Sequence, residues 1–94
     1  SRMTIMMQDV TEDTISATVT ATGPILVSVV GTMKEGRVRI TGNLGNGEAT
    51  AYTYCPGDQT SLARLEFAAG VNFKAYLEGT ESEDTEVTVE YIDV

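Results

Sequence analysis

Apolar and polar side chains alternate along most of this 94-residue chain, and no other sequence feature limits its fold as much. A strand with one buried face repeats every two residues, whereas an amphipathic helix repeats every 3.6 residues. Residues 71–77 show the two-residue period most clearly, with Val71, Phe73, Ala75 and Leu77 on one face. Similar stretches occupy residues 15–22, 37–41, 49–54, 62–67 and 87–91. We therefore expect an all-β protein, because no segment has the pattern of a capped helix.

Turn signals separate these stretches at intervals of about a dozen residues, which is typical of a sandwich or barrel. Asn46-Gly47 predicts a hairpin, and Pro56-Gly57 suits the centre of a type II turn. The sequence predicts seven strands, or eight if residues 4–7 add an edge strand. We expect one domain over residues 1–94, with 1–13 as an extended arm or edge strand. The expected architecture is an antiparallel β-sandwich, immunoglobulin-like or jelly-roll, and a small closed barrel is the second choice.

The apolar run at residues 25–30 interrupts the alternation and begins with Ile25, Leu26 and Val27. A strand that is covered on both faces has this pattern. The run is therefore a candidate for burial between the two sheets or between subunits. Only 6% of the residues are aromatic and none is Trp, so the core depends on smaller side chains. Self-association would add buried area to such a core, and we expect a homo-oligomer.

The formal net charge of −8 excludes several classes of partner. Neither a nucleic-acid backbone nor an anionic membrane surface would attract this chain, so no nucleic-acid or membrane partner is predicted. No apolar stretch is long enough to span a membrane, and no signal peptide is visible. Ser1-Arg2 before Met3 is interpreted as a vector remnant or a processing scar. With Cys55 as the only cysteine, no intrachain disulfide can form, which favours folding in a reducing cytosol.

Catalytic groups are scarce in this sequence. There is no His, so neither a Cys–His pair, a Ser–His–Asp triad nor a Cys/His zinc site can be built. A Ser–Lys arrangement with Lys34 or Lys74 has no support from the neighbouring sequence. The carboxylates lie in loops or on outer strand faces, and a domain this small has little room for a cleft that would raise a carboxyl pKa. We predict no enzymatic activity and no cofactor.

Two loops are candidate ligand sites. The acidic loop at residues 81–86 could supply oxygen ligands to calcium, but it lacks the EF-hand pattern, and a solvated hairpin tip is the favoured interpretation. The glycine-rich stretch at 42–47 lacks the Lys and the following helix of a phosphate-binding loop, so it is interpreted as a turn. No metal site is predicted.

Three tyrosines, Tyr52, Tyr54 and Tyr76, are the candidate binding platform, because a phenol ring offers both a flat apolar face and a hydroxyl. Packing on a sheet face is the favoured alternative for most of them. Tyr76 lies opposite the core face of its strand and is expected to be exposed, whereas Tyr91 is expected in the core. The alternation does not assign the face that carries Tyr52 and Tyr54. Together with Ile25, Leu26 and Val27, the three tyrosines form the predicted binding or interface surface.

The second half of the chain resembles small phage structural proteins. The matching elements are residues 36–40 with the pattern Gly-x-Val-x-Ile, residues 69–75 with Ala-Gly followed by Lys-Ala, Gly79, and the Val-Thr-Val of residues 87–89. The resemblance implies a head-decoration, head-fibre or knob protein. Such a protein is a homo-oligomer, often a trimer, that binds a capsid or tail protein. It resides in the virion after assembly in the host cytoplasm, and no catalytic residue is implied. The alternative hypothesis is an excised extracellular module that binds a carbohydrate or a protein.

Overall fold

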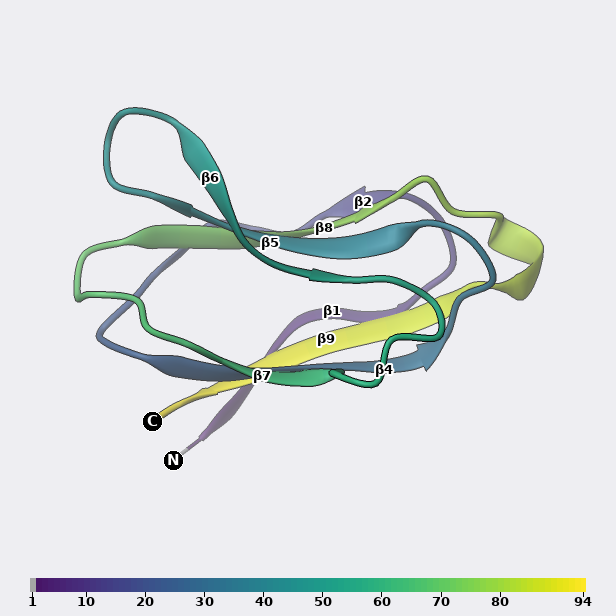
Figure 1. The fold of residues 1–94 in the computed structure, drawn as a ribbon, viewed down its shortest axis with the longest axis horizontal. Helices are drawn as coiled ribbons and strands as arrows, with labels where there is room; N and C mark the ends of the chain where they lie inside the picture. The colour runs from purple at the N-terminus through teal and green to yellow at the C-terminus, as the bar shows by residue number, and fades with distance from the viewer. Residues whose placement is uncertain (1) are drawn as a thin grey trace.

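The computed structural model describes residues 2–94 apart from the side chain of Ser82, so the interpretation of Ser1 lies outside the described residues. Within this range, strands form two antiparallel sheets that pack face to face (Figure 1). This arrangement confirms the predicted sandwich and not the closed barrel. No helix in the described range is long and apolar enough to cross a membrane.

The first sheet has four strands in the order β1-β9-β4-β7. These strands are β1 (Met3–Val10), β9 (Glu86–Asp93), β4 (Ile25–Thr32) and β7 (Leu62–Leu65). The second sheet has the order β2-β8-β5-β6, and β3 also pairs with β8. Its strands are β2 (Thr14–Ile15), β3 (Val19–Thr20), β8 (Asn72–Glu78), β5 (Arg37–Asn43) and β6 (Glu48–Tyr54). A short 3-10 helix, η1 (Ser82–Asp84), connects the two sheets between β8 and β9.

The strand pairing is nested along the chain. β1 pairs with β9, β2 and β3 with β8, β4 with β7, and β5 with β6. Counted with β2 and β3 as one interrupted strand, this is the pairing of a long hairpin rolled up on itself. The pairs β4–β9 and β5–β8 join these strand pairs into the two sheets. Of the two predicted sandwich types, the chain therefore has the jelly-roll topology.

The strand expected over residues 15–22 is interrupted, and Ser16 provides the physical reason. Its hydroxyl accepts the Ala75 N–H at 2.8 Å and donates to the Ala17 carbonyl at 2.9 Å. A serine side chain that binds backbone groups in this way competes with the regular ladder between strands. Two short strands, β2 and β3, replace the predicted long one.

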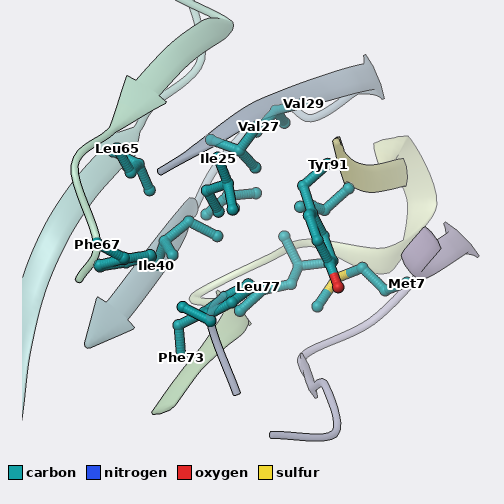
Figure 2. Close-up of a cluster of buried hydrophobic side chains, with 14 of the residues drawn as sticks. Met7, Ile25, Val27, Val29, Ile40, Leu65, Phe67, Phe73, Leu77 and Tyr91 are labelled. Atoms are coloured by element: carbon teal, nitrogen blue, oxygen red, sulfur yellow. The ribbon is translucent and has the colours of Figure 1, made fainter. Parts of the chain in front are cut away.

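The core lies between the sheets and is built on the inward residues of β4, β5, β8 and β9 (Figure 2). The Phe73 ring stacks on Phe67 and meets Tyr91 edge-on, with ring centres 5.2 Å apart in both pairs. Tyr91 is buried, as predicted. The hairpin at Asn46-Gly47 also forms, although positive φ angles occur at Gly45 and Gly47 rather than at Asn46. The Pro56-Gly57 turn closes with a hydrogen bond of 3.0 Å from Asp58 N to the Cys55 carbonyl.

Within one chain, residues 25–30 are covered on one face only, and not on both faces as expected. Ile25, Val27 and Val29 are buried, but Val30 is 50% exposed and Leu26 is only half-buried. Nothing in the described chain packs on the outer face of the four-stranded sheet. Alternate side chains of the run therefore fill the core, and the side chains between them face solvent.

Candidate interaction surfaces

The three candidate tyrosines do not form one platform. Tyr52 and Tyr54 are half-buried against the core, whereas Tyr76 lies on the outer face of β8. A β-bulge explains the inward turn of Tyr52, because Ile40 pairs with Tyr52 and Thr41 pairs with Thr50, which leaves Ala51 as an extra residue. The Tyr52 hydroxyl donates to the Thr60 carbonyl, and burial raises the pKa of Tyr52 above its ordinary value of 10.0.

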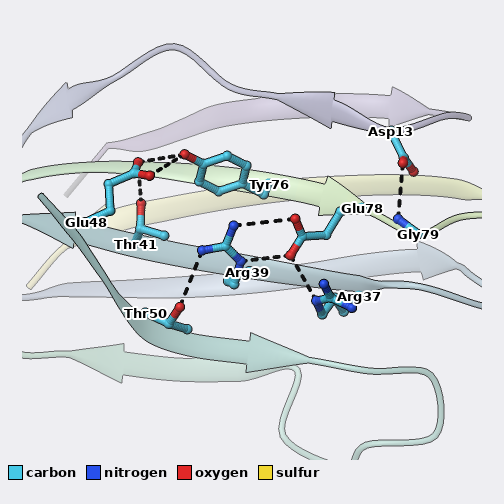
Figure 3. A network of polar contacts seen from close by, with 9 residues as sticks. All are labelled: Asp13, Arg37, Arg39, Thr41, Glu48, Thr50, Tyr76, Glu78 and Gly79. Atoms are coloured by element: carbon cyan, nitrogen blue, oxygen red, sulfur yellow. Dashed lines mark hydrogen bonds and ion pairs between the residues drawn. The ribbon is translucent and has the colours of Figure 1, made fainter.

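Tyr76 is occupied by its neighbours and is not a free stacking surface (Figure 3). The Arg39 guanidinium lies 4.4 Å from the ring centre and the Lys74 ammonium 5.2 Å from it. The phenol hydroxyl donates to the Glu48 carboxylate at 2.6–2.7 Å. Together with the Thr41 hydroxyl, this hydrogen bond holds the pKa of Glu48 below its ordinary value. The expectation of an exposed Tyr76 is therefore replaced by a half-buried ring inside a polar network.

Charged side chains continue this network along β5 and β8. Glu78 Oε1 accepts from Arg37 Nε at 2.9 Å and from Arg39 Nε at 2.8 Å, and Glu78 Oε2 accepts from Arg39 Nη2 at 3.4 Å. The hydrogen bond from Arg39 is the main reason that the pKa of Glu78 lies below its ordinary value. Lys74 Nζ lies 3.3 Å from Glu48 Oε1. The cations on the outer face of this sheet are thus paired within the chain, and the face presents little unmet charge.

The outer face of the four-stranded sheet is different, because large apolar side chains meet there across strands. Met3 pairs with Ile92, and Ile92 pairs with Leu26. In the next row, Ile5 pairs with Glu90 and Leu62 pairs with Ser28. Met3, Ile5 and Leu62 are 51%, 43% and 58% exposed, and Leu26 and Ile92 are half-buried. We call the surface formed by Met3, Ile5, Leu26, Leu62 and Ile92 the apolar face.

Polar groups on the apolar face are few. Ser28 Oγ donates to Glu90 Oε1 at 3.4 Å between the two flanking residues Ile5 and Leu62. A shallow depression of about 150 Å³ lies over this region. Single exposed apolar side chains are normal on protein surfaces, but contiguous groups of them mark interaction sites. The apolar face is therefore the leading candidate interaction surface.

Of the predicted interface residues, only Leu26 belongs to this face. Ile25 and Val27 are fully buried between the sheets, so they form core rather than interface. Sequence reasoning missed Met3, Ile5, Leu62 and Ile92. Leu62 and Ile92 occupy the positions that the alternation assigns to the solvent side, and an apolar residue at such a position is the signal that could have identified them.

A second concave region lies beside the β5–β6 hairpin. The bulge at Ala51 bends β6 away from the sheet, as the teal loop at the upper left of Figure 1 shows. The resulting groove of about 490 Å³ is lined mainly by apolar groups, among them Leu44, Ala49, Phe67 and Val71. Gly42 also lines the groove. A Cβ at that position would lie 3.0 Å from the Phe67 ring. The volume of the groove lies within the range of small-ligand pockets.

The acidic loop gives no support to a calcium site. Asp13 lies beside the start of the loop, but its carboxylate accepts from Gly79 N, Thr80 N and Thr80 Oγ1 at 2.7–3.1 Å. These hydrogen bonds, with the Thr80 hydroxyl first, hold the pKa of Asp13 below 3.8. Asp84 lies 3.8 Å from the Lys34 ammonium. Over residues 2–94, no three Cys, Asp or Glu side chains converge as metal ligands would.

Comparison of the chain with protein-family models, with curated proteins and with solved structures gives no match. The two outer faces of the sandwich differ in character. On the outer face of the five-stranded sheet, the cations form ion pairs within the chain. The outer face of the four-stranded sheet presents apolar side chains to solvent.

Proposed function

We propose that this chain is a non-catalytic structural protein that assembles into a homo-oligomer through the apolar face and decorates a phage virion. The observation that carries the proposal is the cross-strand row of Met3, Ile92 and Leu26, which leaves large apolar side chains without a covering layer. Burial of such a row removes hydrocarbon from water at about 25 cal/mol per Å² of area. Self-association is the simplest way for a chain of this size to obtain that burial.

A virion location is favoured by the sequence resemblance and not by the fold. Jelly-roll domains build viral shells, but they also occur in lectins and cupins, so the fold does not choose between these functions. The resemblance of residues 36–40 and 69–89 to small phage structural proteins favours the virion. The proposed partners are a second copy of the chain and a capsid or tail protein, with no nucleic acid or membrane.

Light scattering over a range of protein concentrations tests the self-association. The wild type is expected to form a closed oligomer, and Leu26→Asp is expected to shift the mass toward the 10.1 kDa of one chain. Thr53→Asp is the matched control, because it adds the same charge at an exposed position of β6 outside the apolar face. A wild type that stays monomeric at every concentration, or an equal effect of both substitutions, contradicts the proposal.

Purified phage particles test the virion assignment. The chain is expected to remain with intact particles through a density gradient. Recovery only in the soluble fraction, from a lysate that contains intact particles, contradicts the assignment and leaves the self-association in place.

The groove beside the β5–β6 hairpin favours a second candidate function, that of a binding module. A carbohydrate or peptide that binds there should shift the NMR signals of Phe67 and Val71. A glycan array and a peptide library without hits would remove this candidate.

A further inference from the structure

The geometry points to one specific way in which the apolar face meets a second copy of the chain. We infer a two-fold dimer in which the two faces pack on each other about an axis that runs parallel to the strands, between β9 and β4. This inference deepens the proposed function and rests on it. The order of the strands and the register of the rows are sufficient to derive the contacts.

A row here is a set of residues paired side by side across the four strands. A two-fold axis in this position places each strand over a different strand of the second copy, and it places each residue over a residue of the same row. The sheet order β1-β9-β4-β7 then places β9 over β4 of the second copy, and β1 over β7. In the first row, Ile92 faces Leu26 of the second copy, and Leu26 faces Ile92 in return. In the second row, Ile5 faces Leu62 across the interface. Large apolar side chains thus cover one another at both levels.

The polar groups of the face are also compatible with this arrangement. Glu90 and Ser28 form a directly paired position on β9 and β4, so Glu90 faces the Ser28 hydroxyl of the second copy. That hydroxyl has one hydrogen, which it donates to its own Glu90 at 3.4 Å, so in the dimer it donates to the Glu90 of one copy or of the other. At the margin, Arg64 faces Met3, whose flexible thioether chain adapts to its surroundings. No two like charges oppose each other in these rows, and such electrostatic fit selects one docking geometry among several.

An axis perpendicular to the strands gives a poorer match. It stacks each strand on the same strand of the second copy. With the axis through the Glu90 row, Glu90 faces Glu90 of that copy, and with the axis midway between the two rows it faces Ile92. With the axis through the Ile92 row, Arg64 faces Arg64. Each choice buries a charge against a like charge or against hydrocarbon, which is unfavourable. The parallel axis is therefore preferred.

Twist limits how far the matched rows extend. Packed sheets keep their strand directions within about 30° of each other, so the register is best preserved near the axis. The contacts from β9 to β4 lie nearest the axis, whereas those from β1 to β7 lie at the margin. The pair Leu26 and Ile92 is consequently the most sensitive reporter of this geometry.

A mixing experiment with opposite charges tests the pairing. Leu26→Glu and Ile92→Lys are each expected to weaken self-association by roughly tenfold or more, because each places a charge against an apolar residue. Mixed in equal amounts, the two variants are expected to restore a species of twice the 10.1 kDa chain mass. Native mass spectrometry should identify it as the heterodimer, in which Glu at position 26 faces Lys at position 92. Circular dichroism verifies that each variant is folded, and the swapped pair Leu26→Lys with Ile92→Glu replaces any variant that is not.

Leu26→Glu mixed with Leu62→Lys provides the matched control. Both positions belong to the apolar face, but position 62 faces Ile5 and not position 26, so this mixture is expected to remain weakly associated. Rescue by the control mixture, failure of the Leu26→Glu and Ile92→Lys mixture, or a trimeric wild type overturns the two-fold pairing but leaves the proposed use of the apolar face. A wild type that is monomeric at every concentration overturns both.

Discussion

The guanidinium carbon of Arg39 lies 4.4 Å from the centre of the Tyr76 ring. The same guanidinium donates from Nε to Glu78 at 2.8 Å, so one side chain joins an aromatic ring to a carboxylate. Arginine suits this position because its planar, permanently charged group can stack and form a fork of hydrogen bonds at once. This contact, with the hydrogen bond from Tyr76 to Glu48, leaves the Tyr76 ring engaged within the chain.

Arg39→Lys is expected to lower the urea midpoint of unfolding, because an ammonium cannot reproduce both the fork to Glu78 and the contact with Tyr76. Chemical denaturation followed by circular dichroism measures the shift. Arg64→Lys is the control, since Arg64 pairs with Glu66 at an exposed site where an ion pair adds little stability. Equal midpoints for the two variants would contradict a structural role of the network.

Gly31→Ala is expected to destabilise the fold by more than about 3 kcal/mol or to prevent folding. Gly31 has a φ of +113°, and a Cβ at this position would lie 2.0 Å from the Glu86 carbonyl oxygen. Gly45 has a similar φ of +117° but open space around its Cβ direction. Gly45→Ala should therefore cost only the backbone term of about 1–2 kcal/mol. Urea unfolding of both variants separates the clash from the backbone strain, and a similar loss in both would show that the clash is relieved.

Tyr52→Phe is expected to reduce the free energy of unfolding by about 0.5–1.5 kcal/mol, because the Thr60 carbonyl loses its hydrogen-bond donor. Thermal unfolding measures the change. Tyr54→Phe is a close control, since the Tyr54 hydroxyl makes no hydrogen bond within residues 2–94, and its loss should be nearly neutral. A neutral Tyr52→Phe would mean that water replaces the lost hydroxyl.

Asp13 is expected to contribute to the acid sensitivity of the protein. Its folded-state pKa lies below 3.8 because the carboxylate accepts hydrogen bonds from Thr80 and Gly79. A lowered folded-state pKa stabilises the protein above the unfolded-state pKa, and this contribution disappears as the pH falls through the folded-state pKa. Asp13→Asn should lower the melting temperature near pH 7 and reduce its decline between about pH 5 and pH 2. Calorimetry over this range tests the prediction, with Glu12→Gln as a neighbouring control. A decline as steep as that of the wild type would assign the acid sensitivity to other groups.

Local signals predicted much of the fold. The alternation at residues 71–77 predicted β8 and its inward Phe73 and Leu77, because the period of two belongs to the strand itself. Pro56-Gly57 and Asn46-Gly47 predicted their turns from backbone preferences of the residues involved. Bulges and interruptions were not predictable in this way. Ala51 resembles any other strand residue in the sequence, yet its unpaired position turns Tyr52 inward.

By itself, then, the sequence determined the acidic charge of the chain and predicted a β-sandwich, since periodicity, turn chemistry and net charge are properties of the residues and their near neighbours. Only the tertiary structure decided which apolar residues remain uncovered. Ile25 and Leu26 are adjacent and similar in character, but Ile25 is in the core and Leu26 is on the apolar face. The difference arises because burial depends on which distant strand packs against each side of the sheet. The rolled order of the strands covers the inner side and brings Met3, Ile92 and Leu26 together on the other.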